Sequence, residues 1–216
     1  MGREAGADEA GGPNGPAPRG RRASFAERKE RRAAIEDPTI VLEAAARFLE
    51  PRARSVAEVR RRLTGAGYRP ELVEGAIERM LELGMLDDEA FARAWIESRD
   101  RARPRGGRAI RQELAQKGVE RSTVDLVLGE RREAAAGVPG DEDGAAVSAD
   151  EAAADRLLAR NARSLARVAD PRQRRQRAYA LLARNGFDPD VCRMVAARVD
   201  DARGADGHED VGPYPG

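Results

Sequence analysis

Apolar residues recur at intervals of three and four along most of this chain, which is the spacing of an amphipathic helix. In the first such segment, predicted from about Thr39 to Glu50, the apolar side consists of Val41, Leu42, Ala45, Phe48 and Leu49. Similar stripes follow in later segments, and the alternation typical of a β-strand is found nowhere in the sequence. The pattern therefore predicts an all-α protein.

One short motif divides the helical pattern into repeats. A Leu, three further residues, a Gly and an apolar residue occur three times, at Leu63 to Tyr68, Leu114 to Val119 and Leu182 to Phe187. Four residues are about one helical turn, so the Leu packs inward and the Gly lies where the chain leaves the helix. Further helices are predicted directly after each motif, over residues 70–77, 121–128 and 189–196. A helical unit used three times is typical of a binding architecture.

Helix-start signals complete the units. Ser55 with Glu58, and Ser148 with Glu151, match the capping-box pattern, and either Asp87 or Asp88 is placed to cap the helix after it. The predicted fold is an elongated tandem array of three three-helix modules with disordered termini. Its expected parts are a mostly disordered extension (1–37), repeat 1 (38–86), repeat 2 (87–133), an acidic flexible linker (134–149), repeat 3 (150–201) and a disordered tail (202–216). Ser24 and Glu27 predict a short helix within the extension.

Composition fits helices with broad solvated faces, because 36% of residues are charged and only 4% are aromatic. The formal net charge of +1 hides segregation, since the segment from Arg99 to Arg111 holds six Arg and one Asp. We expect no membrane span, because no apolar run approaches ~20 residues. The absence of an N-terminal apolar stretch and the single cysteine, Cys192, favour a cytoplasmic protein without an intramolecular disulfide.

The sequence offers little for catalysis. The one histidine, His208, lies in a polar tail, and Cys192 falls on the apolar side of a helix, where a buried thiol is expected. Asp87 and Asp88 fit helix capping better than acid–base chemistry. Phosphate loops, zinc spacings and nucleophile motifs are absent, so we predict no enzyme activity, cofactor or metal site.

The segment from Ser55 to Leu128 resembles the RecX family, regulators of the bacterial recombinase RecA. The resemblance is carried by Leu83-Gly84-Met85-Leu86-Asp87-Asp88-Glu89-Ala90-Phe91-Ala92, by Trp95 and Arg99, by Gly107 to Leu114, and by Lys117-Gly118-Val119. It implies a curved array of three-helix modules that binds in the groove of the RecA–DNA filament, contacts several protomers and lowers ATP hydrolysis and strand exchange. It also implies a role in recombination, DNA repair and the SOS response, with the protein acting as a monomer.

Basic side chains are the candidates for partner binding. We expect these contacts at Arg60, Arg61, Arg62, Arg105, Arg108, Arg111, Arg172, Arg174 and Arg175. Such a surface suits an acidic protein groove, single- or double-stranded nucleic acid, or both. The alternatives are a helical-repeat protein that competes for DNA, and a scaffold for another protein. Single-strand binders interleave exposed aromatics with basic residues, whereas Trp95 and Tyr68 are expected to pack, so the sequence argues against a dedicated single-strand binder.

Overall fold

The structure is a computed structural model that describes residues 24–136 and 148–199. Within these ranges it contains ten α-helices and no strand. The helices are α1 (Phe25–Ala33), α2 (Pro38–Leu49), α3 (Val56–Ala66), α4 (Pro70–Glu82), α5 (Asp88–Ala102), α6 (Gly107–Lys117), α7 (Arg121–Ala136), α8 (Ala149–Ala166), α9 (Pro171–Arg184) and α10 (Pro189–Ala197).

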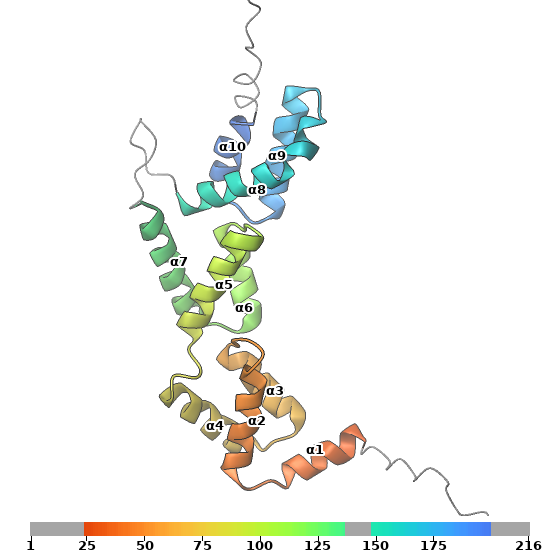
Figure 1. The fold of residues 1–216 in the computed structure, drawn as a ribbon, viewed down its shortest axis with the longest axis vertical. Coiled ribbons are helices and arrows are strands. Elements are labelled where there is room, and N and C mark those ends of the chain that lie inside the picture. The colour runs from red at the N-terminus through yellow and green to blue at the C-terminus, as the bar shows by residue number, and fades with distance from the viewer. Residues whose placement is uncertain (1–23, 137–147, 200–216) are drawn as a thin grey trace, which may run out of the picture.

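After α1, the helices form three modules that follow one another along the long axis of the molecule (Figure 1). Module 1 comprises α2 to α4, module 2 comprises α5 to α7, and module 3 comprises α8 to α10. Each module has its own apolar core, centred on Val59 and Ile77 in module 1, on Ile110 and Leu114 in module 2, and on Leu182 in module 3. The predicted all-α array of three-helix modules is therefore confirmed.

Helix starts follow the capping signals. Ser55 forms a complete capping box with Glu58, and the hydroxyl of Ser148 accepts the backbone N–H of Glu151. The Asp87 carboxylate accepts the N–H groups of Glu89 and Ala90, so Asp87 caps α5. These side chains satisfy N–H groups that have no partner inside a helix.

Helix ends at the repeated motif follow the glycine signal. Gly67, Gly118 and Gly186 all have left-handed backbones, with φ of 102°, 81° and 80°. After each, the N–H of the apolar residue returns to the carbonyl of the motif's Leu, as in the 3.1 Å bond from Val119 to Leu114. This pattern is the Schellman motif, which needs a left-handed residue at its turn. The predicted helix ends are therefore confirmed.

The sequence placed one boundary too early. Helix α7 continues to Ala136, beyond the expected start of the acidic linker at residue 134. Alanines 134 to 136 favour helix as strongly as any residue, so nothing stops α7 before them. The rest of that linker, and the tails predicted to be disordered, fall largely on residues 1–23, 137–147 and 200–216, outside the described residues, as does His208.

Two further expectations concern single features. Cys192 is buried in the core of module 3, as predicted, and burial raises the pKa of its thiol. Across residues 24–136 and 148–199, no helix is both long and apolar enough to cross a membrane.

Candidate interaction surface

The second helices of successive modules, α3, α6 and α9, meet end to end. At the first junction, between modules 1 and 2, the Ser55 hydroxyl donates to the carbonyl of Lys117, 2.6 Å away. At the second junction, between modules 2 and 3, the N–H of Gly106 donates to the carbonyl of Asn185 at 3.1 Å. In both cases the accepting carbonyl directly precedes the glycine that ends the helix. The negative end of one helix dipole therefore faces the positive end of the next, which stabilises the contact.

Glycine is required where these helices meet. A Cβ added to Gly118 would lie 2.4 Å from the Cβ of Ala57, and one added to Gly186 would lie 2.4 Å from the Cβ of Ala109. Real Cβ atoms do not approach so closely, and the left-handed backbone disfavours a side chain in addition. The glycine of the repeated motif thus ends its own helix and admits the neighbouring module.

At each junction, an aspartate of one module accepts the first backbone N–H of the second helix of the preceding module. Asp88 accepts the N–H of Val56, the first residue of α3, at 2.9 Å. Asp150 accepts the N–H of Gly107, the first residue of α6, at 3.0 Å. Burial raises the pKa of Asp88. Of the two aspartates that the sequence offered as caps, Asp87 therefore caps its own helix and Asp88 caps the helix of the preceding module.

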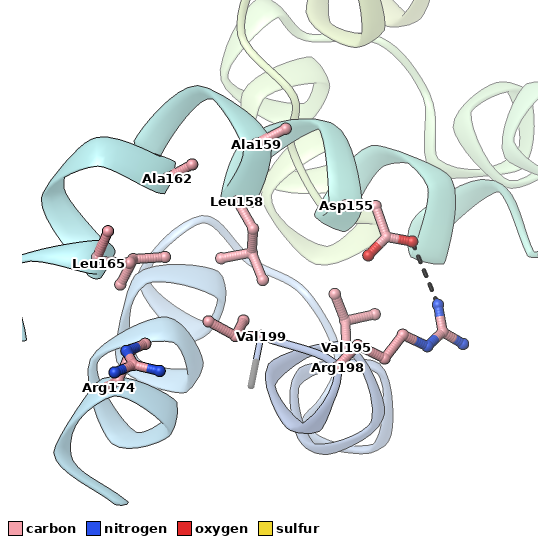
Figure 2. Close-up of a pocket in the computed structure, with 10 residues that line it drawn as sticks. Asp155, Leu158, Ala159, Ala162, Leu165, Arg174, Val195, Arg198 and Val199 are labelled. Atoms are coloured by element: carbon pink, nitrogen blue, oxygen red, sulfur yellow. Dashed lines mark hydrogen bonds and ion pairs between the residues drawn. The ribbon is translucent and has the colours of Figure 1, made fainter. Parts of the chain in front are cut away.

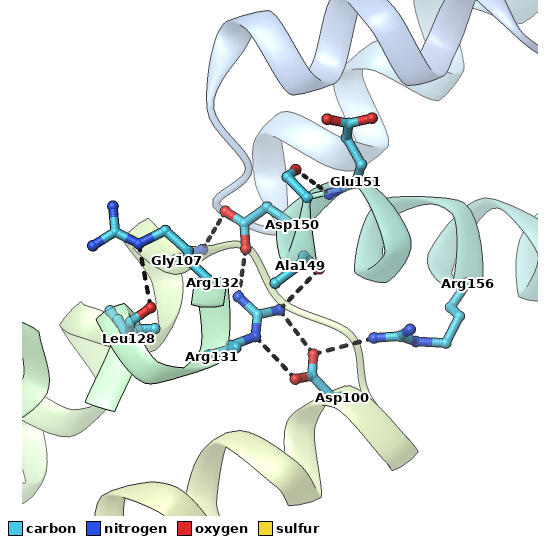
Figure 3. Close-up of polar contacts among 10 residues, drawn as sticks. Asp100, Gly107, Leu128, Arg131, Arg132, Ala149, Asp150, Glu151 and Arg156 are labelled. Atoms are coloured by element: carbon cyan, nitrogen blue, oxygen red, sulfur yellow. Dashed lines mark hydrogen bonds and ion pairs between the residues drawn. The ribbon is translucent and has the colours of Figure 1, made fainter. Parts of the chain in front are cut away.

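The second junction carries an additional ionic cluster around Arg131 (Figure 3). The Arg131 guanidinium binds both carboxylate oxygens of Asp100 at 2.9 Å and reaches Asp150 at 2.5 Å. Its side chain is only 9% exposed. Burial alone would lower the pKa of Arg131, but its bonds to Asp100 and Asp150 raise it. The sequence had not singled out Arg131, since its partners are 31 and 19 residues away.

In module 1, the three consecutive arginines have different surroundings. Arg60 forms a two-bond ion pair with Glu74, with both distances 2.7 Å. Arg61 is exposed and its Nη2 lies 3.5 Å from the carbonyl of Lys117. Arg62 is also exposed, and its guanidinium lies 5.6 Å from the ring centre of Phe48. Arg61 and Arg62 are therefore the residues of this group with charge available to a partner.

In module 2, acids from outside the segment 99–111 lie next to two of its arginines. Arg111 pairs with Asp125 at 3.0 Å, in the place that Arg60 and Glu74 occupy in module 1. Arg105 lies at the second junction, 2.8 Å from the side-chain oxygen of Asn185 and 3.6 Å from Glu113. Asp125, Glu113 and Asn185 all lie outside residues 99–111, so a count within that segment did not include them.

In module 2, Arg108 is available to a partner, whereas Trp95 is engaged within the module. Arg108 is exposed and makes no ion pair within residues 24–136 and 148–199. Trp95 packs against the module core, as expected, with its ring centre 5.9 Å from that of Phe91. Its N–H donates to Glu113 at 2.8 Å, so the indole is already engaged within the module.

In module 3, Arg174 is not a surface residue. It is only 5% exposed, and its guanidinium donates to the carbonyl of Val168 at 3.1 and 3.0 Å and to that of Ala169 at 3.2 Å. Arg174 therefore satisfies carbonyls that follow α8 and joins α8 to α9. Arg172 and Arg175 on the same helix are exposed.

An apolar cavity of about 490 Å³ lies between α8, α9 and α10 (Figure 2). Its walls include Leu158, Leu165 and Val199, and an ion pair of 3.2 Å between Asp155 and Arg198 lies at its edge. The described residues contain no group of three or more side chains placed to hold a metal ion.

Family models for the three domains of RecX match the three modules. The first three-helix domain matches residues 42–80, the second residues 87–128 and the third residues 149–195. Regulatory protein RecX of Streptomyces lividans is 31% identical over 151 residues, covering 68% of this chain and 72% of that protein. The chain belongs to the RecX family.

Other relatives match over different lengths. Regulatory protein RecX of Mycobacterium avium is 29% identical over 71% of this chain and 81% of its own length. For several mycobacterial RecX proteins the chain spans less than half of the relative, as with that of Mycobacterium sp. (strain JLS), at 39% identity over 45% of its length. The crystal structure of RecX from Lactobacillus salivarius shares the fold, with a TM-score of 0.63, 16% identity and coverage of 76% of this chain and 97% of that one. The chain thus shares its fold with that structure and its family with proteins named regulatory protein RecX.

Proposed function

We propose that this RecX-family protein binds along the RecA–DNA filament, contacts more than one RecA protomer, and lowers ATP hydrolysis and strand exchange without chemistry of its own. A ligand shifts such a filament only by binding one of its states better than the other. We expect the protein to act as a cytoplasmic monomer.

The observation that carries this proposal is the end-to-end contact of α3, α6 and α9. These helices have 11, 11 and 14 residues. At 1.5 Å per residue, their summed length is about 50 Å, enough to extend past one small protein domain. Glycine and aspartate contacts fix each junction before binding. The modules are therefore already aligned, and no conformational entropy has to be lost to align them when the partner binds. An extended, pre-organised array suits a partner that is itself a repeating polymer.

The exposed arginines of the second helices supply the charge for this contact. Of the nine arginines expected to bind, Arg61, Arg62, Arg108 and Arg172 are exposed and form no ion pair with the carboxylates of residues 24–136 and 148–199. Arg60 and Arg111 retain exposed edges beside Glu74 and Asp125, so we assign them a secondary role. We do not include Arg174, because it is buried.

The test is ATP hydrolysis by the RecA of the same organism on single-stranded DNA, with this protein titrated in. We expect hydrolysis to fall at concentrations too low to coat the DNA, as measured in parallel without RecA. We expect Arg61→Ala with Arg108→Ala to raise the half-inhibitory concentration about ten-fold, which corresponds to about 1.4 kcal/mol. The control is Arg79→Ala with Arg121→Ala, which removes two exposed charges from the third helices α4 and α7.

Two results would contradict the proposal. Inhibition that begins only when the DNA is coated would favour the alternative, a helical-repeat protein that competes for DNA. Its binding would then weaken steeply with salt, according to the number of phosphates neutralised. An equal loss of inhibition in both double variants would show that the arginines of the second helices are not the contact with the filament.

A further inference from the structure

A cavity of about 260 Å³ lies in module 1, where α1, α2 and the end of α3 meet. Its lining combines three arginines, two aromatic rings and an apolar wall: Arg32, Arg47, Arg62, Phe48, Tyr68 and Leu63. The sequence had placed Phe48 and Tyr68 only in the packing of helices. Both rings are partly buried against the core of module 1, and both also face guanidinium groups.

The guanidiniums are held against these rings. Arg32 lies 5.8 Å from the ring centre of Tyr68, and Arg54 and Arg62 lie 4.3 and 5.6 Å from that of Phe48. A guanidinium above an aromatic ring is attracted to it and keeps its N–H edges free for an oxyanion. The stacking thus orients donors that would otherwise be mobile.

Positive charge exceeds negative charge at this cavity. Of the three lining arginines, Arg47 has an ion pair, with Glu43 at 2.9 Å, and both of these side chains are well exposed. The cavity therefore has donors for an anion in addition to its apolar wall.

Helix α1 completes the cavity by docking on α3 much as α3 docks on α6. A Cβ on Gly67 would strike Lys29 of α1, and Arg32 donates to the carbonyl of Ala66, directly before that glycine, at 3.3 Å. The same carbonyl position at the other two ends, in Lys117 and Asn185, accepts from Ser55, the N-cap of α3, and from Gly106. Because α1 precedes the segment matched by the first RecX domain, residues 42–80, its contribution is not part of that domain model.

We propose that this cavity binds single-stranded nucleic acid, with one unstacked base inside and the neighbouring phosphates on Arg47 and Arg62. A nucleotide satisfies both halves of the lining, because its base covers the wall formed by the partly exposed Ala44 and Ala66 while its phosphate meets the guanidiniums. An acidic peptide would pair with the arginines and leave that wall in water. A duplex keeps its bases stacked and does not supply one to a cavity.

This inference deepens the proposed function by naming the DNA strand as a direct contact, and it is tested without RecA. The probe is a fluorescein-labelled oligothymidylate, whose binding to the full chain is followed by anisotropy. We expect Arg47→Ala with Arg62→Ala to weaken binding about ten-fold or more and to reduce the salt slope by about one to two. We expect Arg79→Ala with Arg121→Ala to weaken it less than about two-fold, because these residues lie outside the cavity.

A second variant separates stacking from charge. Arg47→Lys with Arg62→Lys keeps both charges but removes the planar groups, and we expect it to bind more weakly than the parent chain at equal thermal stability. Equal weakening in the cavity and control variants, equal binding of a duplex of the same length, or a cavity-dependent binding of polyglutamate but not of oligothymidylate would each overturn the inference. Inhibition of RecA is measured in a separate assay. A failure of the cavity to bind oligothymidylate would therefore overturn this inference without deciding whether the protein inhibits RecA.

Discussion

The two junctions of this protein share one contact and differ in what surrounds it. At both, a left-handed glycine lets the end of one second helix touch the start of another, and an aspartate caps the latter. The first junction adds an ion pair of 2.7 Å between Lys117 and Glu58. The second adds the buried Arg131 cluster and donation by Arg160 to carbonyls at the end of α5.

The difference follows the length of chain that joins the modules. Five residues, 83–87, connect α4 to α5, whereas twelve, 137–148, connect α7 to α8. A longer connection costs more entropy to close, so less of the alignment comes from the chain itself. The second junction has more ionic contacts to hold its modules together. The backbone contact between second helices is thus the same at both junctions, while the side chains around it differ with the length of the connecting segment.

The largest expected effect tests the shared contact. Gly186→Ala places a Cβ 2.4 Å from the Cβ and 2.5 Å from the N of Ala109, so we expect a loss of about 2–4 kcal/mol from left-handed strain and the clash together. Gly84→Ala is the matched control, because Gly84 also has a positive φ, of 66°, but nothing lies within 4 Å of its added Cβ. We expect it to cost about 1–2 kcal/mol from strain alone. Urea unfolding of the full chain measures both, and equal losses would show that the helix ends do not need glycine for their contact.

The next effect tests what is particular to the second junction. Arg131→Ala leaves Asp100 and Asp150 without their shared cation, and we expect a loss of about 2–3 kcal/mol, less than for fully buried pairs because both carboxylates keep some contact with water. Arg93→Ala removes an equally bidentate but exposed pair with Glu130 and should change stability little. Thermal unfolding compares the two. A similar small change in both would mean that the cluster does not hold modules 2 and 3 together.

The smallest effect tests the first junction through pH. Burial alone would raise the pKa of Glu58, but its hydrogen bond and ion pair with Lys117, together with the Ser55 N–H and Arg52, lower it. The ionised carboxylate therefore adds stability above its ordinary pKa of 4.5, and this contribution is lost as the pH falls through the lowered value in the folded protein. We expect Glu58→Gln to cost about 1 kcal/mol at pH 7 and nothing in strong acid.

The control for this prediction is Glu74→Gln. Its bonds to Arg60 lower the pKa of Glu74 as well, but Glu74 is exposed and lies within module 1 rather than at a junction. We expect Glu74→Gln to lower the free energy of unfolding less than Glu58→Gln does, with the same dependence on pH. A Glu58→Gln deficit that persists unchanged into strong acid would assign the effect to packing rather than to charge.

Several features were correctly predicted because their signals are local. The Ser55 and Ser148 caps and the glycine helix ends involve residues within five positions of one another, so the sequence around each contains all the information needed. The boundary of α7 was missed because its sequence lacks a stop signal at residue 134 and continues with alanines. The order of the three units and the resemblance to RecX rested on the same local motifs.

The side-chain partners of the arginines could not be predicted in this way. Arg111 meets Asp125 on the next helix, and Arg174 turns inward to carbonyls that follow α8, although both residues appeared as members of basic runs. A run of basic residues in the sequence shows only which residues are present. Whether each one faces solvent, an acid or a carbonyl depends on how neighbouring helices cross.

The sequence by itself determined the helices, most of their ends and their threefold repetition, because capping and apolar spacing act within one or two turns. The tertiary structure decided which ends meet, which aspartate caps which helix, which arginines stay exposed, and that α1 closes a basic and aromatic cavity on module 1. These features depend on contacts between residues far apart in the chain, and the packing of the modules fixes such contacts only once the helices have formed.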